Sequence, residues 1–294
     1  MPSLTSAAAW PVEPPLFVVL AVGLLYWLGG RRQVAGRRRS RLERRSRETA
    51  FYLGLLTILV ALDSPLDSLA DKLFAAHMAQ HVLLLTVAPP LLLLGEPSLR
   101  IWQPLPLGFR RSVAKSVARR RWAAPLRGAG RLLARPVPAF ALFNGVLLAW
   151  HVPVLYDATL RSQPVHDLEH ALFVATALLF WAQAIESKPL HARLDQLRRT
   201  VYVTGALLVS WVLAIVLAFA PSPLYSAYAA LPSRPGGLSA LGDQQLAAGV
   251  MWVPGSIAFT IAIFLSFYRW LDPEPDRALT MRRNGGPLGA AGHH

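Results

Sequence analysis

The sequence predicts an all-α integral membrane protein, a bundle of about seven transmembrane helices with its N-terminus outside and its C-terminus in the cytoplasm. Hydrophobic residues make up 54% of the 294 residues, charged residues make up only 16%, and the mean hydropathy is +0.39. Soluble domains contain roughly 25% charged residues, so this composition argues against a soluble enzyme and against a disordered chain. The sequence contains no cysteine, which excludes disulfides, thiolate metal sites and iron–sulfur clusters.

Seven apolar segments approach the roughly 20 residues that a helix needs to cross the hydrocarbon core. In chain order they are Pro14–Gly30, Arg47–Leu62, Leu73–Leu94, Val137–Pro153, Val165–Ile185, Thr200–Ala220 and Gln244–Tyr268. The first follows Glu13 and precedes an arginine run, which is the reverse of a signal peptide, so we expect a retained span. The second is short for a span. The third contains Pro89 and Pro90, which remove backbone hydrogen bonds and predict a kink.

The Lys and Arg residues are concentrated in alternate connecting segments, and this asymmetry predicts the orientation. All of the 30 except Lys72, Arg161 and Arg234 lie within 31–47, 100–135, 188–199 and 269–283. Cytoplasmic loops carry the excess of Lys and Arg, so these four segments are predicted to lie inside. Arginines beside span ends contact lipid headgroups. The net charge of +14 therefore indicates membrane lipid as a partner, and we expect no nucleic acid.

This topology divides the chain into a short outer segment, 1–13, a seven-helix membrane domain, 14–271, and a cytoplasmic tail, 272–294. The tail is polar and glycine-rich, so we expect it to be disordered. The membrane domain includes two basic cytoplasmic loops, at about 31–47 and 95–136. Within the second loop, Leu107–Trp122 has apolar residues at a spacing of four between basic ones, which predicts a cationic helix on the inner leaflet.

Five of the eight histidines lie near the predicted outer ends of three spans. Two lie in the third span, one ends the fourth, and two open the fifth. Two pairs among them are four residues apart, so both rings of each pair lie on one helix face and can chelate one ion. Polar residues inside a membrane are costly and face the bundle interior. We therefore predict a metal site formed by His77, His81, His151, His166 and His170.

Further donors fall in the same predicted layer and are secondary candidates: Met78, Glu169, Asp243 and Met251. Glu169 is a candidate ligand or an acceptor that fixes a histidine tautomer. Met251 either offers a soft thioether or packs in the core. Imidazole suits copper, zinc, iron and nickel, so the histidines alone leave the metal open. We interpret the nearby aromatic residues as interfacial-belt or packing residues: Trp150, Trp181, Trp252, Tyr156, Tyr225 and Tyr228.

Two other classes of metal protein fit parts of the pattern. His166, Glu169 and His170 match H-x-x-E-H, a zinc-hydrolase motif in which two histidines bind zinc and the glutamate activates water. The motif needs a third ligand on the same side, whereas the later glutamates, Glu186 and Glu274, are predicted at the inner side. A single haem at the outer face is the second alternative. A transporter is disfavoured because the sequence contains no visible internal repeat.

Three blocks of the sequence carry a family resemblance. The first is the run from His77 to Pro97, HMAQHVLLLTVAPPLLLLGEP. The second consists of Trp150-His151-Val-Pro153 with Tyr156, the run His166-Asp-Leu-Glu169-His170, and Leu179-Phe-Trp181. The third consists of Asp243-Gln244-Gln245 and Met251-Trp252-Val-Pro254-Gly255. Together, over roughly residues 50 to 270, they resemble the polytopic cytochrome c oxidase assembly factor family called CtaG.

The resemblance implies a multi-pass protein of the bacterial plasma membrane that matures a haem–copper oxidase at its copper centres. It implies the same five histidines as candidate ligands, with Glu169, Asp243 and Met251 as secondary ones, and oxidase subunits as partners. We accordingly expect a non-catalytic assembly factor that holds copper in a His-lined outer site and delivers it to an oxidase subunit, with zinc or haem as the alternatives. A scaffolding role without metal delivery is also open, and the sequence contains no signal for the oligomeric state.

Overall fold

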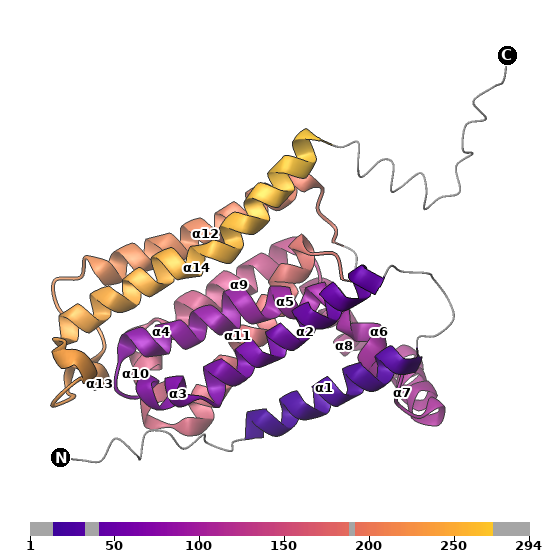
Figure 1. Ribbon diagram of the computed structural model, residues 1–294, viewed down its shortest axis with the longest axis horizontal. Helices are drawn as coiled ribbons and strands as arrows, with labels where there is room; N and C mark the ends of the chain where they lie inside the picture. Colours follow the sequence, from indigo (N-terminus) through magenta and orange to yellow (C-terminus); the bar gives the residue numbers. More distant parts are fainter. Residues whose placement is uncertain (1–13, 33–40, 188–191, 273–294) are drawn as a thin grey trace.

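The computed structural model describes residues 14–32, 41–187 and 192–272, and this part of the chain folds into helices without a strand. Long helices run side by side in a bundle, and shorter helices gather at its two ends (Figure 1). The prediction of an all-α protein is confirmed for these residues. The outer segment 1–13, the tail from residue 273 and three histidines, His191, His293 and His294, lie outside the described residues.

Each of the seven predicted apolar segments forms helix. Six of them are the single helices α1 (Pro14–Arg32), α2 (Arg41–Leu62), α9 (Pro136–Trp150), α11 (Gln163–Ala184), α12 (Gln196–Ala218) and α14 (Ala240–Leu271). The third segment is a continuous run of α4 (Phe74–Val82), η2 (Leu83–Val87) and α5 (Ala88–Leu94). The sequence-based helix boundaries agree with these to within four residues, except that α2 begins six residues before the predicted Arg47.

Fewer of these helices meet a strict length and hydropathy requirement for a membrane span. Among the described residues, Phe74–Leu94, Gln196–Ala218 and Ala240–Leu271 meet it. A fourth is added if Arg121–Leu133 and Pro136–Trp150, which meet at 85°, form one broken span. The α9 helix has only 15 residues, and α2 begins with an arginine-rich turn. The count of seven spans and the orientation of the termini therefore stay predictions.

The connecting helices segregate to opposite ends of the bundle (Figure 1). One end holds α3 (Pro65–Ala70), α10 (Pro153–Arg161) and α13 (Ser226–Ala229), with the short turn η4 (Pro235–Gly237) before α14. The other end holds α6 (Pro97–Trp102), α7 (Leu107–Arg119), η3 (Arg121–Ala123) and α8 (Ala124–Leu133). Residues 95–136, which we expected as a loop, are thus largely helical. The α7 helix lies within the stretch predicted to be a cationic helix.

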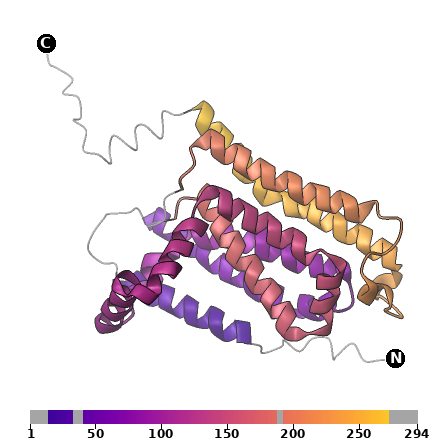
Figure 2. The ribbon, with the colours of Figure 1, turned by 180° about the vertical axis from the view of Figure 1, so that it is seen from behind.

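The long helices form two packed groups. The α12 and α14 helices lie side by side along one side of the bundle (Figure 2), and α1 packs on α2 and α6 at the other side. The α1–α6 approach is very close, because a Cβ at Gly29 would lie 1.8 Å from the carbonyl oxygen of Arg100. The α9 and α11 helices supply the aromatic core of Phe143, Phe173, Phe180 and Trp181, which also packs against residues of η2, α5, α12 and α14.

The prolines of the third segment do not end the helix. Instead, the chain makes a π-helical turn at Leu83–Val87 immediately before Pro89 and Pro90. Proline has no N–H, so a carbonyl one turn earlier lacks its usual donor. The indole N–H of Trp181 supplies one, at 2.9 Å from the carbonyl oxygen of Leu85. The Trp181 side chain of α11 therefore holds the continuous helix of α4, η2 and α5 in place, about one turn after His81.

Candidate metal centre

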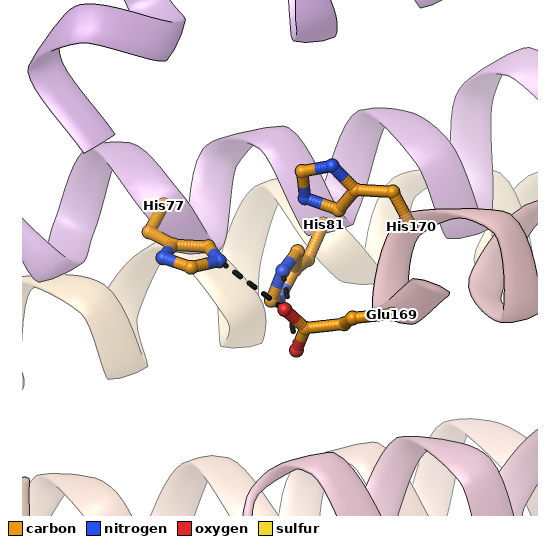
Figure 3. Close-up of side chains that lie close together, drawn as sticks. All are labelled: His77, His81, Glu169 and His170. Atoms are coloured by element: carbon orange, nitrogen blue, oxygen red, sulfur yellow. Dashed lines mark ion pairs between the residues drawn. The ribbon is translucent and has the colours of Figure 1, made fainter. Parts of the chain in front are cut away.

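Two helices, α4 and α11, bring four metal-binding side chains together in the bundle interior. His77 and His81 lie one turn apart on α4, and Glu169 and His170 are consecutive on α11 (Figure 3). One donor atom from each of the four residues lies within 4.8 Å of the others. All four side chains are buried. The local cause is the i, i+4 spacing on α4, which turns both rings to one face.

Glu169 lies between the two histidines of α4. Its Oε2 is 3.7 Å from Nε2 of His77, and its Oε1 is 3.6 Å from Nε2 of His81 (Figure 3). These distances are too long for hydrogen bonds. They are close to the spacing of about 3.3 Å between ligands that each lie about 2.0 Å from a tetrahedral ion. The carboxylate thus faces both rings across a gap of the size that one cation fills.

The atoms of this cluster that could bind a metal have no hydrogen-bond partner among the described residues. They are Nε2 of His77, both ring nitrogens of His81, both carboxylate oxygens of Glu169 and Nε2 of His170. A buried polar atom without a partner costs about 1–3 kcal/mol, and several together in an apolar interior would be a large penalty. A bound cation removes this penalty, so the residues present fit a metal ion.

Tyr228 fixes the tautomer of His77. Its hydroxyl lies 3.1 Å from Nδ1 of His77 and donates its own proton to the carbonyl of Ala70. Burial raises the pKa of Tyr228, so the hydroxyl keeps this proton. The hydroxyl must then accept a hydrogen bond from Nδ1–H, which leaves the lone pair of His77 on Nε2, the atom that faces Glu169.

The other predicted histidines adjoin the cluster without belonging to the group of four. The His166 ring lies 5.0 Å from that of His77 and 4.1 Å from that of His170, and the side chain is half-buried. The His151 ring lies 6.2 Å from that of His81. Nδ1 of His151 donates to the carbonyl of Leu147 at 2.7 Å, and Nε2 lies 3.4 Å from Sδ of Met78. All five rings therefore form one connected layer.

The structure places Asp243 away from the donor group. Its two oxygens accept the backbone N–H groups of Phe74 and Ala75, at 2.9 and 3.0 Å, and so cap the first turn of α4. Asp243 thus positions the helix that carries His77 and His81. Met251 lies on the wall of a cavity that also borders His81 and His151.

Sequence reasoning missed the part that tyrosines play at this end of the bundle. Tyr156, Tyr225 and Tyr228 are all buried and pack around Phe74, so the packing interpretation is correct and the interfacial one is not. Tyr225 donates to the carbonyl of His151 at 3.1 Å. The only sequence signal for this role was that the tyrosines lie in segments flanking the histidine helices. Sequence spacing alone does not show which histidine a tyrosine hydroxyl contacts.

Comparison with known protein families identifies the family of this chain. A family model described as cytochrome c oxidase caa3 assembly factor (Caa3_CtaG) matches residues 16–272. The chain belongs to this family. The match extends over the whole Caa3_CtaG helical bundle described above, from α1 to the end of α14, and it confirms the family resemblance seen in the three sequence blocks. The four clustered donors lie inside the matched range.

Relatives of this Caa3_CtaG protein include two mycobacterial proteins. The uncharacterized protein Mb0105 of Mycobacterium bovis and the uncharacterized protein MT0111 of Mycobacterium tuberculosis are each 24% identical to it over 269 residues. That alignment covers 91% of this chain and 39% of each relative, so the chain spans about two fifths of their length. No solved structure matches the chain.

Proposed function

We propose that this Caa3_CtaG protein holds a copper ion between α4 and α11 and delivers it to a subunit of the oxidase whose assembly it serves. The observation that supports this most strongly is the group of His77, His81, Glu169 and His170, whose donor atoms converge within 4.8 Å and are buried without partners in the described part of the chain. The family connects the chain to cytochrome c oxidase assembly, and copper is the cargo that an imidazole-rich site would take for that enzyme.

The position of the cluster supports loading and release at one membrane face. The donors lie within the first eight residues of α4 and of α11, toward the end of the bundle that holds α3, α10 and α13 (Figure 1). The arginine-rich helices α7 and α8 lie at the opposite end. Since Lys and Arg accumulate on the cytoplasmic side, this polarity supports an outer location for the ion, where delivery requires no crossing of the bilayer.

The test compares metal content with oxidase maturation. Wild-type protein, purified in detergent and loaded with copper, should retain about one ion per chain at the four-donor cluster. The double variant His77→Ala/His81→Ala should lose that ion, and cells that carry it should contain oxidase protein with low activity. Thr176→Val, on α11 and hydrogen-bonded within its own helix, is the control that should behave as wild type. Full oxidase activity in the double variant would contradict the proposal.

A zinc hydrolase is the second candidate, because the rings of His166 and His170 lie 4.1 Å apart with Glu169 between them in the chain. The contacts of Glu169 with both α4 histidines favour a ligand over a free general base. Glu169→Gln separates the two functions. In a hydrolase it abolishes turnover and keeps zinc, whereas in the copper site it weakens metal binding itself. A Soret band in the purified protein would point instead to haem.

A further inference from the structure

His151 and Met78 form a contact that ordinary hydrogen bonding does not explain. His151 caps the C-terminal end of α9, Met78 lies on α4 between the two cluster histidines, and both are buried. Nε2 of His151 lies 3.4 Å from Sδ of Met78, while Nδ1 lies 2.7 Å from the carbonyl oxygen of Leu147. The two ring nitrogens thus face two atoms that have no proton to offer.

Counting protons shows what this arrangement lacks. A carbonyl oxygen only accepts, so the short contact with Leu147 places the imidazole proton on Nδ1. In the neutral ring, Nε2 then presents a lone pair to a thioether sulfur, which also presents one. Protonating both nitrogens would satisfy the contact, but it would place a charge on a buried ring that lies beside the other histidines, at high cost. A cation between nitrogen and sulfur resolves the conflict without that charge on the ring.

The geometry suits a soft ion. Metal–nitrogen and metal–sulfur bonds of about 2.0 and 2.3 Å, meeting at an angle of about 105°, would leave their ends 3.4 Å apart. Thioether sulfur selects soft ions such as Cu(I) over hard or borderline divalent ones. This donor pair differs from the neighbouring cluster, whose donors are imidazole nitrogens and a carboxylate.

A cavity borders His151 and reaches the neighbouring four-donor cluster, and Met78 lies outside its lining residues. The cavity is also lined by His81, Leu85, Leu147, Met251 and Phe259. His81 also belongs to the four-donor cluster, and both of its ring nitrogens are buried without a partner in the described chain. The cavity wall therefore includes one residue from each donor set.

We propose that His151 and Met78 form a second metal site, specific for a soft monovalent cation such as Cu(I), next to the four-donor cluster. His151 and His81 both border the cavity, and their rings lie 6.2 Å apart, so an ion held by one site lies next to the other. This inference adds a site and an ion class to the proposed function, and it holds independently of whether the protein delivers copper to an oxidase.

The decisive probe is X-ray absorption at the copper edge on full-length protein in detergent, loaded anaerobically with Cu(I). The chain has no cysteine and four methionines, so a sulfur scatterer at about 2.3 Å from copper must be a methionine. The wild type should show this scatterer. A spectrum with only nitrogen and oxygen neighbours at saturating Cu(I) would overturn the proposal, and this measurement needs no variant that might misfold.

Matched variants assign the sulfur. Met78→Leu conserves volume and should remove the scatterer and lower Cu(I) affinity by more than about tenfold. Met251→Leu, the same change at the other methionine that is buried among the described residues, should retain both. A scatterer that persists in Met78→Leu, or disappears in Met251→Leu, would overturn the assignment.

Zinc separates this proposal from the function proposed above. Zn(II) binding reports the four-donor cluster, so Met78→Leu should leave it unchanged. The double variant His77→Ala/Glu169→Gln should lose Zn(II) and keep the copper–sulfur scatterer. Loss of the scatterer in that variant would show that no separate soft site exists, whereas absent Zn(II) binding in the wild type would count against the four-donor cluster alone.

Discussion

The hydroxyl of Tyr228 accepts a hydrogen bond from Nδ1 of His77 at 3.1 Å and thereby directs the lone pair of that ring toward Glu169. The two residues are 151 positions apart in the chain, and the tyrosine lies on α13, outside the helices that supply the donors. Partners of this kind set both the tautomer and the orientation of a ligand. The contact therefore extends the candidate site to a helix that contributes no ligand.

Replacing Tyr228 by phenylalanine removes only this hydroxyl. We expect Tyr228→Phe to keep the fold and to lower metal affinity about 10–100-fold, because His77 loses the acceptor that fixes its tautomer. Tyr225→Phe is the control, since its hydroxyl donates to the backbone of His151 and touches no ring nitrogen. Competition with a chromophoric chelator measures both affinities. Equal affinities in the two variants would show that Tyr228 has no such role.

Asp243 should control metal binding without being a ligand. In Asp243→Asn one acceptor oxygen becomes an NH₂ group, so one of the buried N–H groups of Phe74 and Ala75 loses its partner. We expect a loss of about 1–3 kcal/mol in the free energy of unfolding, together with weaker metal binding as α4 shifts. Thermal unfolding in detergent and metal titration measure the two effects.

Asp195→Asn provides the matched control for that variant. Asp195 also caps a helix, α12, by accepting from Arg198 N–H, but it does so at an exposed position. Its replacement should leave metal affinity unchanged. If Asp243→Asn keeps wild-type metal affinity despite a lower melting temperature, the cap does not position the site.

The close approach of α1 and α6 leads to a prediction about stability. Gly29→Ala would place a methyl group 1.8 Å from the carbonyl oxygen of Arg100, and a backbone atom moves only with its helix. We expect destabilisation by about 1–3 kcal/mol or more. Gly145→Ala on α9, where no atom lies within 4 Å of the added carbon, should be neutral or stabilising by about 0.5–1 kcal/mol. A melting temperature for Gly29→Ala equal to that for Gly145→Ala would refute the close approach.

The α7 helix should bind anionic lipid. It carries Arg110, Arg111 and Lys115 beside exposed apolar side chains such as Phe109 and Val117, a pattern typical of a helix on a charged membrane surface. Each cation near such a surface contributes about 1 kcal/mol. The wild type should therefore melt at a higher temperature in phosphatidylglycerol nanodiscs than in phosphatidylcholine ones. Changing these three cations to glutamine, with Arg119 at the end of α7 unchanged, should reduce this difference, and an unchanged difference would exclude the three cations as its source.

The helices were predictable because apolar length is a local property. All seven segments are helical, and the two histidine pairs lie on helix faces as their spacing requires. The rotation of each helix about its axis is set by packing against others, so the sequence did not distinguish His170, which joins the four-donor group, from His151, which contacts Met78. For the same reason the capping role of Asp243 was not predictable. Its acceptor function depends on a helix that begins 169 residues earlier.

The cap on α4 also links the site to the order in which the chain is made. During synthesis, the five histidines of the layer are added before Asp243, which lies on α14, the last helix of the bundle. A nascent chain that ends before residue 240 contains every histidine of the layer, yet it lacks the carboxylate that anchors the first turn beneath His77. We therefore expect the proposed site to bind an ion at full affinity only after the final helix has entered the membrane.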